Sequence, residues 1–341
     1  MTATATTAGS PNRISALDFT KGALVLLMIV YHWLNYFVAA EGDFYRYLRF
    51  VTPSFILITG FLISNVYLSK YDLSDTRLGK RLAQRGAKVM GIFIVLNLII
   101  DLLLHRADMA TVGGPWSPRT LELVYVSGNT EMATGKVAAF YILVPISYLL
   151  LLSAVLILIS HYKYVFLYAF VLFLVVVSAM ELAGAKSANL ELLTIGLLGV
   201  SLGYVPIGKI NRLIAHPYVL LAAYACYLLA ITRWNAIYPL QIFGVCLNVI
   251  LIFLLGTVAG DNSFVAKTVI LLGKYSLVGY IVQIAVLQIL SRGLRSVNLG
   301  LAARGGCFVA AIVLTIASVE VLHRARAKSA AVDGMYRAVF A

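Results

Sequence analysis

Ten apolar stretches of membrane-spanning length dominate this chain of 341 residues. They cover residues 19–40, 50–69, 86–104, 137–159, 162–181, 189–208, 217–232, 238–259, 267–291 and 301–323. A helix that crosses a bilayer needs about 20 predominantly apolar residues. Only 12% of the residues are charged, about half the share found in soluble proteins. The sequence therefore predicts an all-α fold, a polytopic transmembrane bundle of about ten helices with no separate soluble domain.

Basic residues between the second and third stretches predict the orientation of this bundle. The cluster comprises Lys70, Arg77, Lys80, Arg81, Arg85 and Lys88, and more basic residues follow the last stretch at 324–328. Lys and Arg collect in cytoplasmic loops, so we expect both termini in the cytoplasm. The expected organisation is a flexible tail at 1–17, a bundle at 18–325 and a cytoplasmic tail at 326–341. The same rule explains the net charge of +13, so membrane lipid, and not nucleic acid, is the expected surrounding.

The first apolar stretch contains a histidine in line with charged residues at its start. At about 100° and 1.5 Å per residue, Asp18, Lys21, His32 and Asn35 share one helix face, with His32 roughly 16 Å beyond Lys21. An ionisable group inside a bilayer is costly and indicates a functional site. Neutral imidazole accepts a proton near neutral pH or carries an acyl group itself. A helix-packing hydrogen bond is the structural alternative.

Cations at the cytoplasmic side predict an anion site. Arg85 and Lys88 stand three residues apart and share a helix face, and Arg81 precedes them by one turn. Lys21 supplies a flexible point charge suited to phosphate. A phosphate-rich donor such as a coenzyme A thioester fits this entrance, whereas a topology signal or lipid head-group contact is the alternative. No spacing of His, Cys, Asp or Glu typical of a metal site occurs in the sequence.

Several of these residues fall into an ordered set of motifs. Leu17-Asp18 is followed by Lys21 and, after ten residues, by His32; the second stretch carries Thr59-Gly60-Phe61-Leu62, and the third begins with Arg85 and Lys88. Near the C-terminus, Gly273-Lys274-Tyr275-Ser276 precedes Tyr280 and Gln283. In this order the motifs resemble the membrane-bound acyltransferase family 3, with heparan-glucosaminide acetyltransferase-like and glucan succinyltransferase relatives. The chain departs from the family pattern with lysines at 21 and 88, where the family has arginine, and with Gln283, which cannot act as a base.

The resemblance implies an acyltransferase that moves an acyl group, most simply acetyl, from cytosolic acyl-CoA to a hydroxyl or amine of an extracytoplasmic carbohydrate or glycolipid. It assigns catalysis to His32 and Asp18, donor binding to Lys21, Arg81, Arg85 and Lys88, and substrate contact to Asn35, Thr59, Tyr280 and Gln283. No metal is implied, the implied location is the bacterial cytoplasmic membrane, and the oligomeric state stays open.

Two other interpretations stay open. One is a transporter or flippase that moves an acylated or phosphorylated solute past His32, and the other is a non-catalytic membrane protein descended from such enzymes. The long connection at 105–136, which contains Trp116, is expected to help bind the acceptor, because aromatic rings commonly supply apolar faces at ligand sites.

Overall fold

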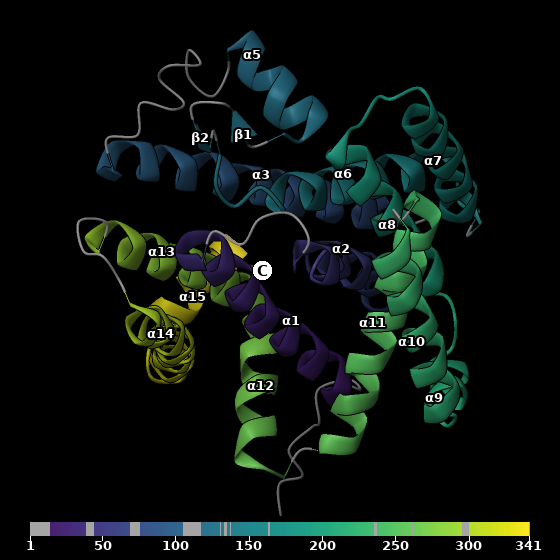
Figure 1. Cartoon of the computed structure of the whole chain (residues 1–341). Helices are drawn as coiled ribbons and strands as arrows, with labels where there is room; N and C mark the ends of the chain where they lie inside the picture. The colour runs from purple at the N-terminus through teal and green to yellow at the C-terminus, as the bar shows by residue number, and fades with distance from the viewer. Residues whose placement is uncertain are drawn as a thin grey trace, which may run out of the picture.

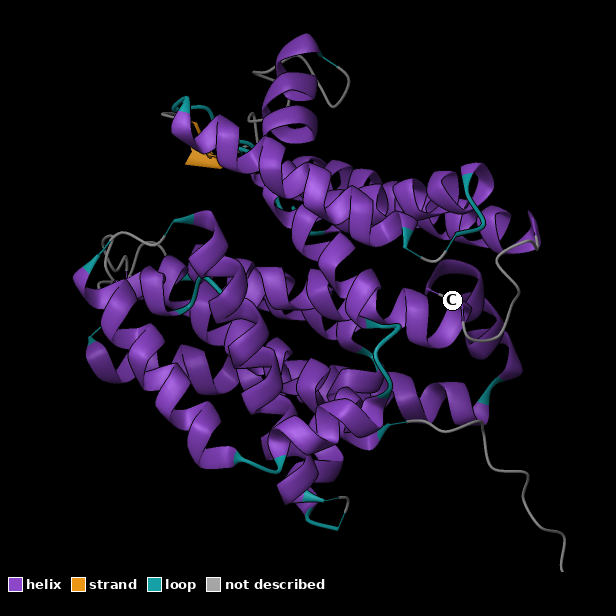
Figure 2. Cartoon of the chain, turned by 90° about the vertical axis from the view of Figure 1, so that its right-hand side faces the viewer, coloured by secondary structure: helices purple, strands orange, loops and turns teal. Residues whose placement is uncertain are grey.

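The structure is a computed structural model in which nearly every described residue is helical (Figures 1 and 2). It describes residues 14–38, 44–68, 76–104, 117–129, 131–132, 135–136, 138–162, 164–234, 237–260, 262–294 and 300–340. Within these ranges the strands are β1 (Glu131–Met132) and β2 (Gly135–Lys136), which pair antiparallel. The helical fold class predicted from the sequence is thus confirmed.

The helices follow one another with short connections. They are α1 (Ser15–Trp33), α2 (Val51–Leu62), α3 (Thr76–Leu104), α5 (Pro118–Thr120), α6 (Leu143–Ile159), α7 (Val165–Leu182), α8 (Ala188–Leu202), α9 (Ile207–Ile214), α10 (Pro217–Arg233), α11 (Tyr238–Ala259), α12 (Phe264–Lys274), α13 (Ser276–Gly293), α14 (Leu301–Lys328) and α15 (Ala330–Phe340). The π-helical segments η1 (Leu34–Val38), η3 (Ile63–Leu68) and η4 (Leu121–Ser127) continue α1, α2 and α5, and η2 (Phe44–Tyr47) is a 3₁₀ turn.

Several helices are long and apolar enough to cross a membrane, so the protein is a multi-pass membrane protein. In the described part of the chain six helices meet this criterion: α1 with η1, α3, α7, α11, α13 and α14. The pair α8 and α9 is a seventh candidate but is bent by 102° at the break between them. Three shorter apolar helices, α2, α6 and α10, account for the other predicted stretches. A full count of ten crossings stays a prediction.

The structure differs from the predicted boundaries in three places. Helix α3 begins at Thr76, so the basic residues from Arg77 to Lys88 lie on its first turns and not in a loop. The predicted stretch 267–291 is divided into α12 and α13 at Tyr275, and the two helices run in different directions (Figure 1). The segment expected as a C-terminal tail contains helix α15. Residues 1–13 and 105–116, including Trp116, lie outside the described residues.

Helix α1 occupies a central place in the bundle. It packs against α2, α11, α12, α13 and α14, and its middle turns bury Leu24, Val25, Met28 and Ile29. A helix that is apolar on most of its faces is covered on most of them, and the uncharged sequence between Lys21 and His32 meets that condition. The polar groups of α1 are therefore held inside the protein and not against lipid.

Candidate functional site

Two glycines bring the start of α1 against α12. A Cβ atom on Gly22 would lie 1.9 Å from the carbonyl oxygen of Val269, and one on Gly273 would lie 1.7 Å from that of Asp18. Both distances are far below a van der Waals contact, so only glycine permits this approach of the two backbones. Lys21 and Lys274 are the chain neighbours of these glycines. The close packing of α1 and α12 therefore places both lysines beside one cavity.

This space, which we call the cationic cavity, has a volume of about 320 Å³ and is lined by residues of α1, α2, α3, α6, α12, α13 and α15. Its basic lining residues are Lys21, Arg85, Lys88 and Lys274, and no aspartate or glutamate lines it among the residues that the structure describes. Four cations facing one space favour an anionic ligand. Thr59 and Tyr280 line the same cavity. Five residues predicted from the sequence, Lys21, Thr59, Arg85, Lys88 and Tyr280, are thus brought together.

Asp18 fixes the position of Lys21. The Lys21 Nζ lies 2.6 Å from the Asp18 Oδ1, one helical turn away, and Asp18 is only 4% exposed. His32 lies 14 residues further along the helix, about 21 Å at 1.5 Å per residue. The structure therefore gives Asp18 a place beside the cationic cavity, where it orients Lys21, and does not bring it to His32.

His32 lines a second, smaller space of about 140 Å³, which we call the histidine cavity. Asn35, predicted to share the face of His32, also lines it, together with Tyr36 and Thr52. The ring of Tyr36 lies 6.3 Å from that of His32, and the Tyr36 hydroxyl accepts a hydrogen bond of 3.1 Å from Gln288. The π-helical segment η1 begins two residues after His32. Such segments are frequent at functional sites, and here η1 directs Asn35 and Tyr36 to the same cavity.

The two cavities share two lining residues, Ile142 and Tyr280. The backbone of Ile142 is hydrogen-bonded to the Tyr280 side chain, and the Tyr280 ring meets that of Phe140 edge to face at 6.1 Å. Tyr280 and Ile142 therefore form the partition between the cations and His32. A ligand that spans the site has its anionic part in one cavity and its reactive end in the other.

Two predicted residues lie outside both cavities. Arg81 is exposed on α3 and lines neither of them. Gln283 is fully buried at 0% exposure, and no hydrogen-bond partner for either amide atom occurs among the described residues. It lies one turn after Gly279, where an added Cβ would meet Val25, and one turn before Leu287, which packs with Ile29. Gln283 thus faces α1 within the helix packing.

Other residues of the site were not selected from the sequence. Lys274 and Tyr275 line the cationic cavity, as do Tyr336, Val339 and Phe340 of α15. The motif Gly273-Lys274-Tyr275-Ser276 was visible in the sequence, but nothing showed that its lysine faces the cations of α1 and α3. Among the described residues, no group of three His, Cys, Asp or Glu side chains is placed to hold a metal ion.

Comparison of the chain with protein-family models, with curated proteins and with solved structures finds no match. The functional argument therefore depends on the two cavities and on the motifs in the sequence.

Proposed function

We propose that the protein is an integral membrane acyltransferase that moves an acyl group, most simply acetyl, from cytosolic acyl-CoA to a hydroxyl or amine of an extracytoplasmic carbohydrate or glycolipid. The observation that carries the proposal is the pair of cavities: one has four cations, the other has His32, and they meet at Tyr280 and Ile142. Phosphates of the donor bind at Lys21, Arg85, Lys88 and Lys274. The pantetheine arm extends along the apolar lining towards the partition.

The histidine cavity supplies the chemistry in this proposal. As general base, the His32 imidazole takes the proton from the acceptor while the acceptor oxygen or nitrogen attacks the thioester carbonyl. The carbon–sulfur bond breaks, and the imidazolium returns the proton to the leaving thiolate. As acyl carrier, the imidazole itself attacks the carbonyl and passes the acyl group to the acceptor in a second step. In either role Asn35, Tyr36 and Thr52 line the space in which the acceptor lies.

A transporter or flippase is the second candidate, since the two cavities lie in line along α1. Detergent-solubilised protein separates the two functions, because no compartments exist in detergent. We expect the purified protein to release free CoA from acetyl-CoA when a glycan acceptor is added, and to yield an acetylated glycan. The measurement is thiol release together with mass spectrometry of the glycan panel. Release of neither product with any acceptor or with water would favour the transporter.

The proposal requires the cationic cavity to face the cytoplasm, with both termini on that side. Glu122 in η4 and Lys80 at the start of α3 are both exposed and flank opposite ends of α3. In a chain whose exposed Cys226 is changed to serine, we expect a membrane-impermeant maleimide added from outside to label Glu122→Cys but not Lys80→Cys. Labelling of Lys80→Cys alone would reverse the topology and remove the cytosolic donor.

The bacterial cytoplasmic membrane is the location that we propose, because it offers cytosolic acyl-CoA on one side and envelope glycans on the other. The apolar outward faces of α7, α10 and α14 leave room for lipid or for a second copy of the chain.

A further inference from the structure

The C-terminal helix α15 forms part of the wall of the cationic cavity. It packs against α3 and α14, and Tyr336, Val339 and Phe340 line the cavity from its last two turns. Met335, on another face of α15, is 65% exposed. The helix therefore turns one set of apolar side chains to the cations and leaves another outside. An amphipathic helix lying only on the membrane surface would have no reason to present its aromatic rings to this cavity.

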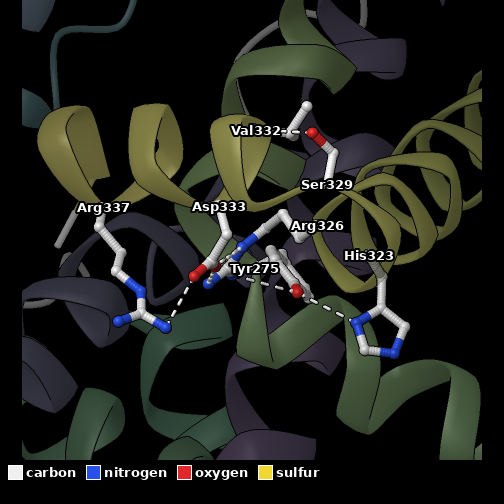
Figure 3. Close-up of polar contacts among 7 residues, drawn as sticks. All are labelled: Tyr275, His323, Arg326, Ser329, Val332, Asp333 and Arg337. Carbon is white, nitrogen blue, oxygen red and sulfur yellow. Dashed lines mark hydrogen bonds and ion pairs between the residues drawn. The ribbon is translucent and has the colours of Figure 1, made fainter.

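Arg326 at the end of α14 holds this helix in place (Figure 3). Its guanidinium donates to the Asp333 Oδ1 at 2.9 Å from Nε and at 2.5 Å from Nη2. The same group donates to the Tyr275 hydroxyl at 3.2 Å and lies 3.7 Å from the centre of the Tyr336 ring. The hydrogen bonds from Arg326 hold the pKa of Asp333 below its ordinary value, so the carboxylate stays charged at neutral pH. One arginine thus connects α14, the α12–α13 junction and α15.

The rings on α15 and the cations on the other walls are complementary to one class of ligand. The Phe340 ring lies 5.2 Å from that of Tyr336 at an angle of 30°, and Arg326 covers Tyr336. Aromatic rings stack on nucleobases whatever the base sequence, and lysine and arginine bind phosphates. A nucleotide combines the two features, whereas inorganic phosphate or a lipid head group offers no flat ring.

We propose that α15 is the nucleobase-binding wall of the cationic cavity. The ring of Phe340, backed by Tyr336, binds the purine of a nucleotide whose phosphates lie against Lys21, Arg85 and Lys274, and Arg326 keeps the wall in position through Asp333. The choice of coenzyme A as the natural ligand rests on the proposed function. ADP tests the same wall without any acyl transfer.

The test is equilibrium binding of coenzyme A, ADP and 4′-phosphopantetheine to the detergent-purified full-length protein. Phe340→Ala should weaken binding of coenzyme A and ADP by at least about fivefold, the lower end of the loss for one stacked base. Binding of 4′-phosphopantetheine, which has a phosphate but no base, should stay unchanged. Phe340 is the penultimate residue, so its truncation leaves the bundle folded. Met335→Ala on the same helix is the matched control and should change nothing.

The ion pair offers a second variant. Asp333→Asn should weaken binding of ADP in the same direction as Phe340→Ala, whereas Glu320→Gln should not, because the Glu320–Arg324 pair lies outside the cavity. Equal loss of all three ligands in Phe340→Ala, or no loss of any, would overturn the inference. Binding of ADP that depends on Phe340 without acyl transfer would leave the inference standing and overturn the proposed function. Failure of the wild type to bind coenzyme A or ADP would overturn both.

Discussion

Replacing His32 with alanine is expected to lower acyl transfer by about 10²–10⁴-fold, the usual contribution of a positioned general base. His32 is the histidine that lines the histidine cavity, on the far side of the partition from the cations. If the imidazole carries the acyl group, the loss should be nearly complete, because no other described lining residue of that cavity is a strong nucleophile. Transfer is measured as CoA release and as acetylated glycan, at equal amounts of folded protein.

The control for His32→Ala is His216→Ala, which removes a histidine that precedes α10 and lines neither cavity. Folding should survive both changes, because one polar contact between membrane helices contributes only about 0.6 kcal/mol on average. Binding of coenzyme A should stay near the wild-type value in His32→Ala, since the phosphates lie in the other cavity. Transfer retained within a few-fold at equal thermal stability would show that His32 is a packing residue and would overturn both catalytic roles.

Helix geometry explains why part of this site was predictable from the sequence. Once residues 19–40 are recognised as a helix, the spacing of Lys21, His32 and Asn35 fixes their common face and the distance between them. The structure confirms that His32 and Asn35 line one cavity and that Lys21 lines the other. Arg85 and Lys88 were paired by the same reasoning, and they do line a common space. Each of these inferences needed only the geometry of a single helix.

Contacts between helices could not be predicted in the same way. Lys274 reaches the cationic cavity because Gly22 and Gly273 let two backbones touch, and no local pattern in the sequence indicates that pairing. Gln283 shares an apolar helix with Tyr280, but a rotation of about 300° around the axis turns it to α1 instead of the cavity. Helix α15 is mostly apolar and short, so composition alone did not distinguish it from a tail. The partner of each helix decides these cases.

The matching prediction for the donor concerns Arg85 and the Asp18–Lys21 pair. Arg85→Ala should weaken binding of coenzyme A by about tenfold or more, since a hydrogen bond to a charged group contributes about 1.5–3 kcal/mol. Lys80→Ala, an exposed cation on the same helix that does not line the cavity, is the matched control and should have no effect. Binding is measured by titration calorimetry in detergent, and the salt dependence should fall together with the affinity.

Lys21 needs a double variant, because its removal alone leaves Asp18 buried without its cation. Breaking a buried ion pair by removing one partner destabilises a protein by about 3–5 kcal/mol, and that loss would be mistaken for a binding effect. In Asp18→Asn/Lys21→Met the pair is removed as a unit, so the bundle should stay folded while coenzyme A binding falls by about the same factor as in Arg85→Ala. Lys21→Arg keeps the charge and the pair and should bind normally. Coenzyme A affinity unchanged in both Arg85→Ala and the double variant would show that the cationic cavity is not the donor site, because it would then lack two of its four cations at no cost.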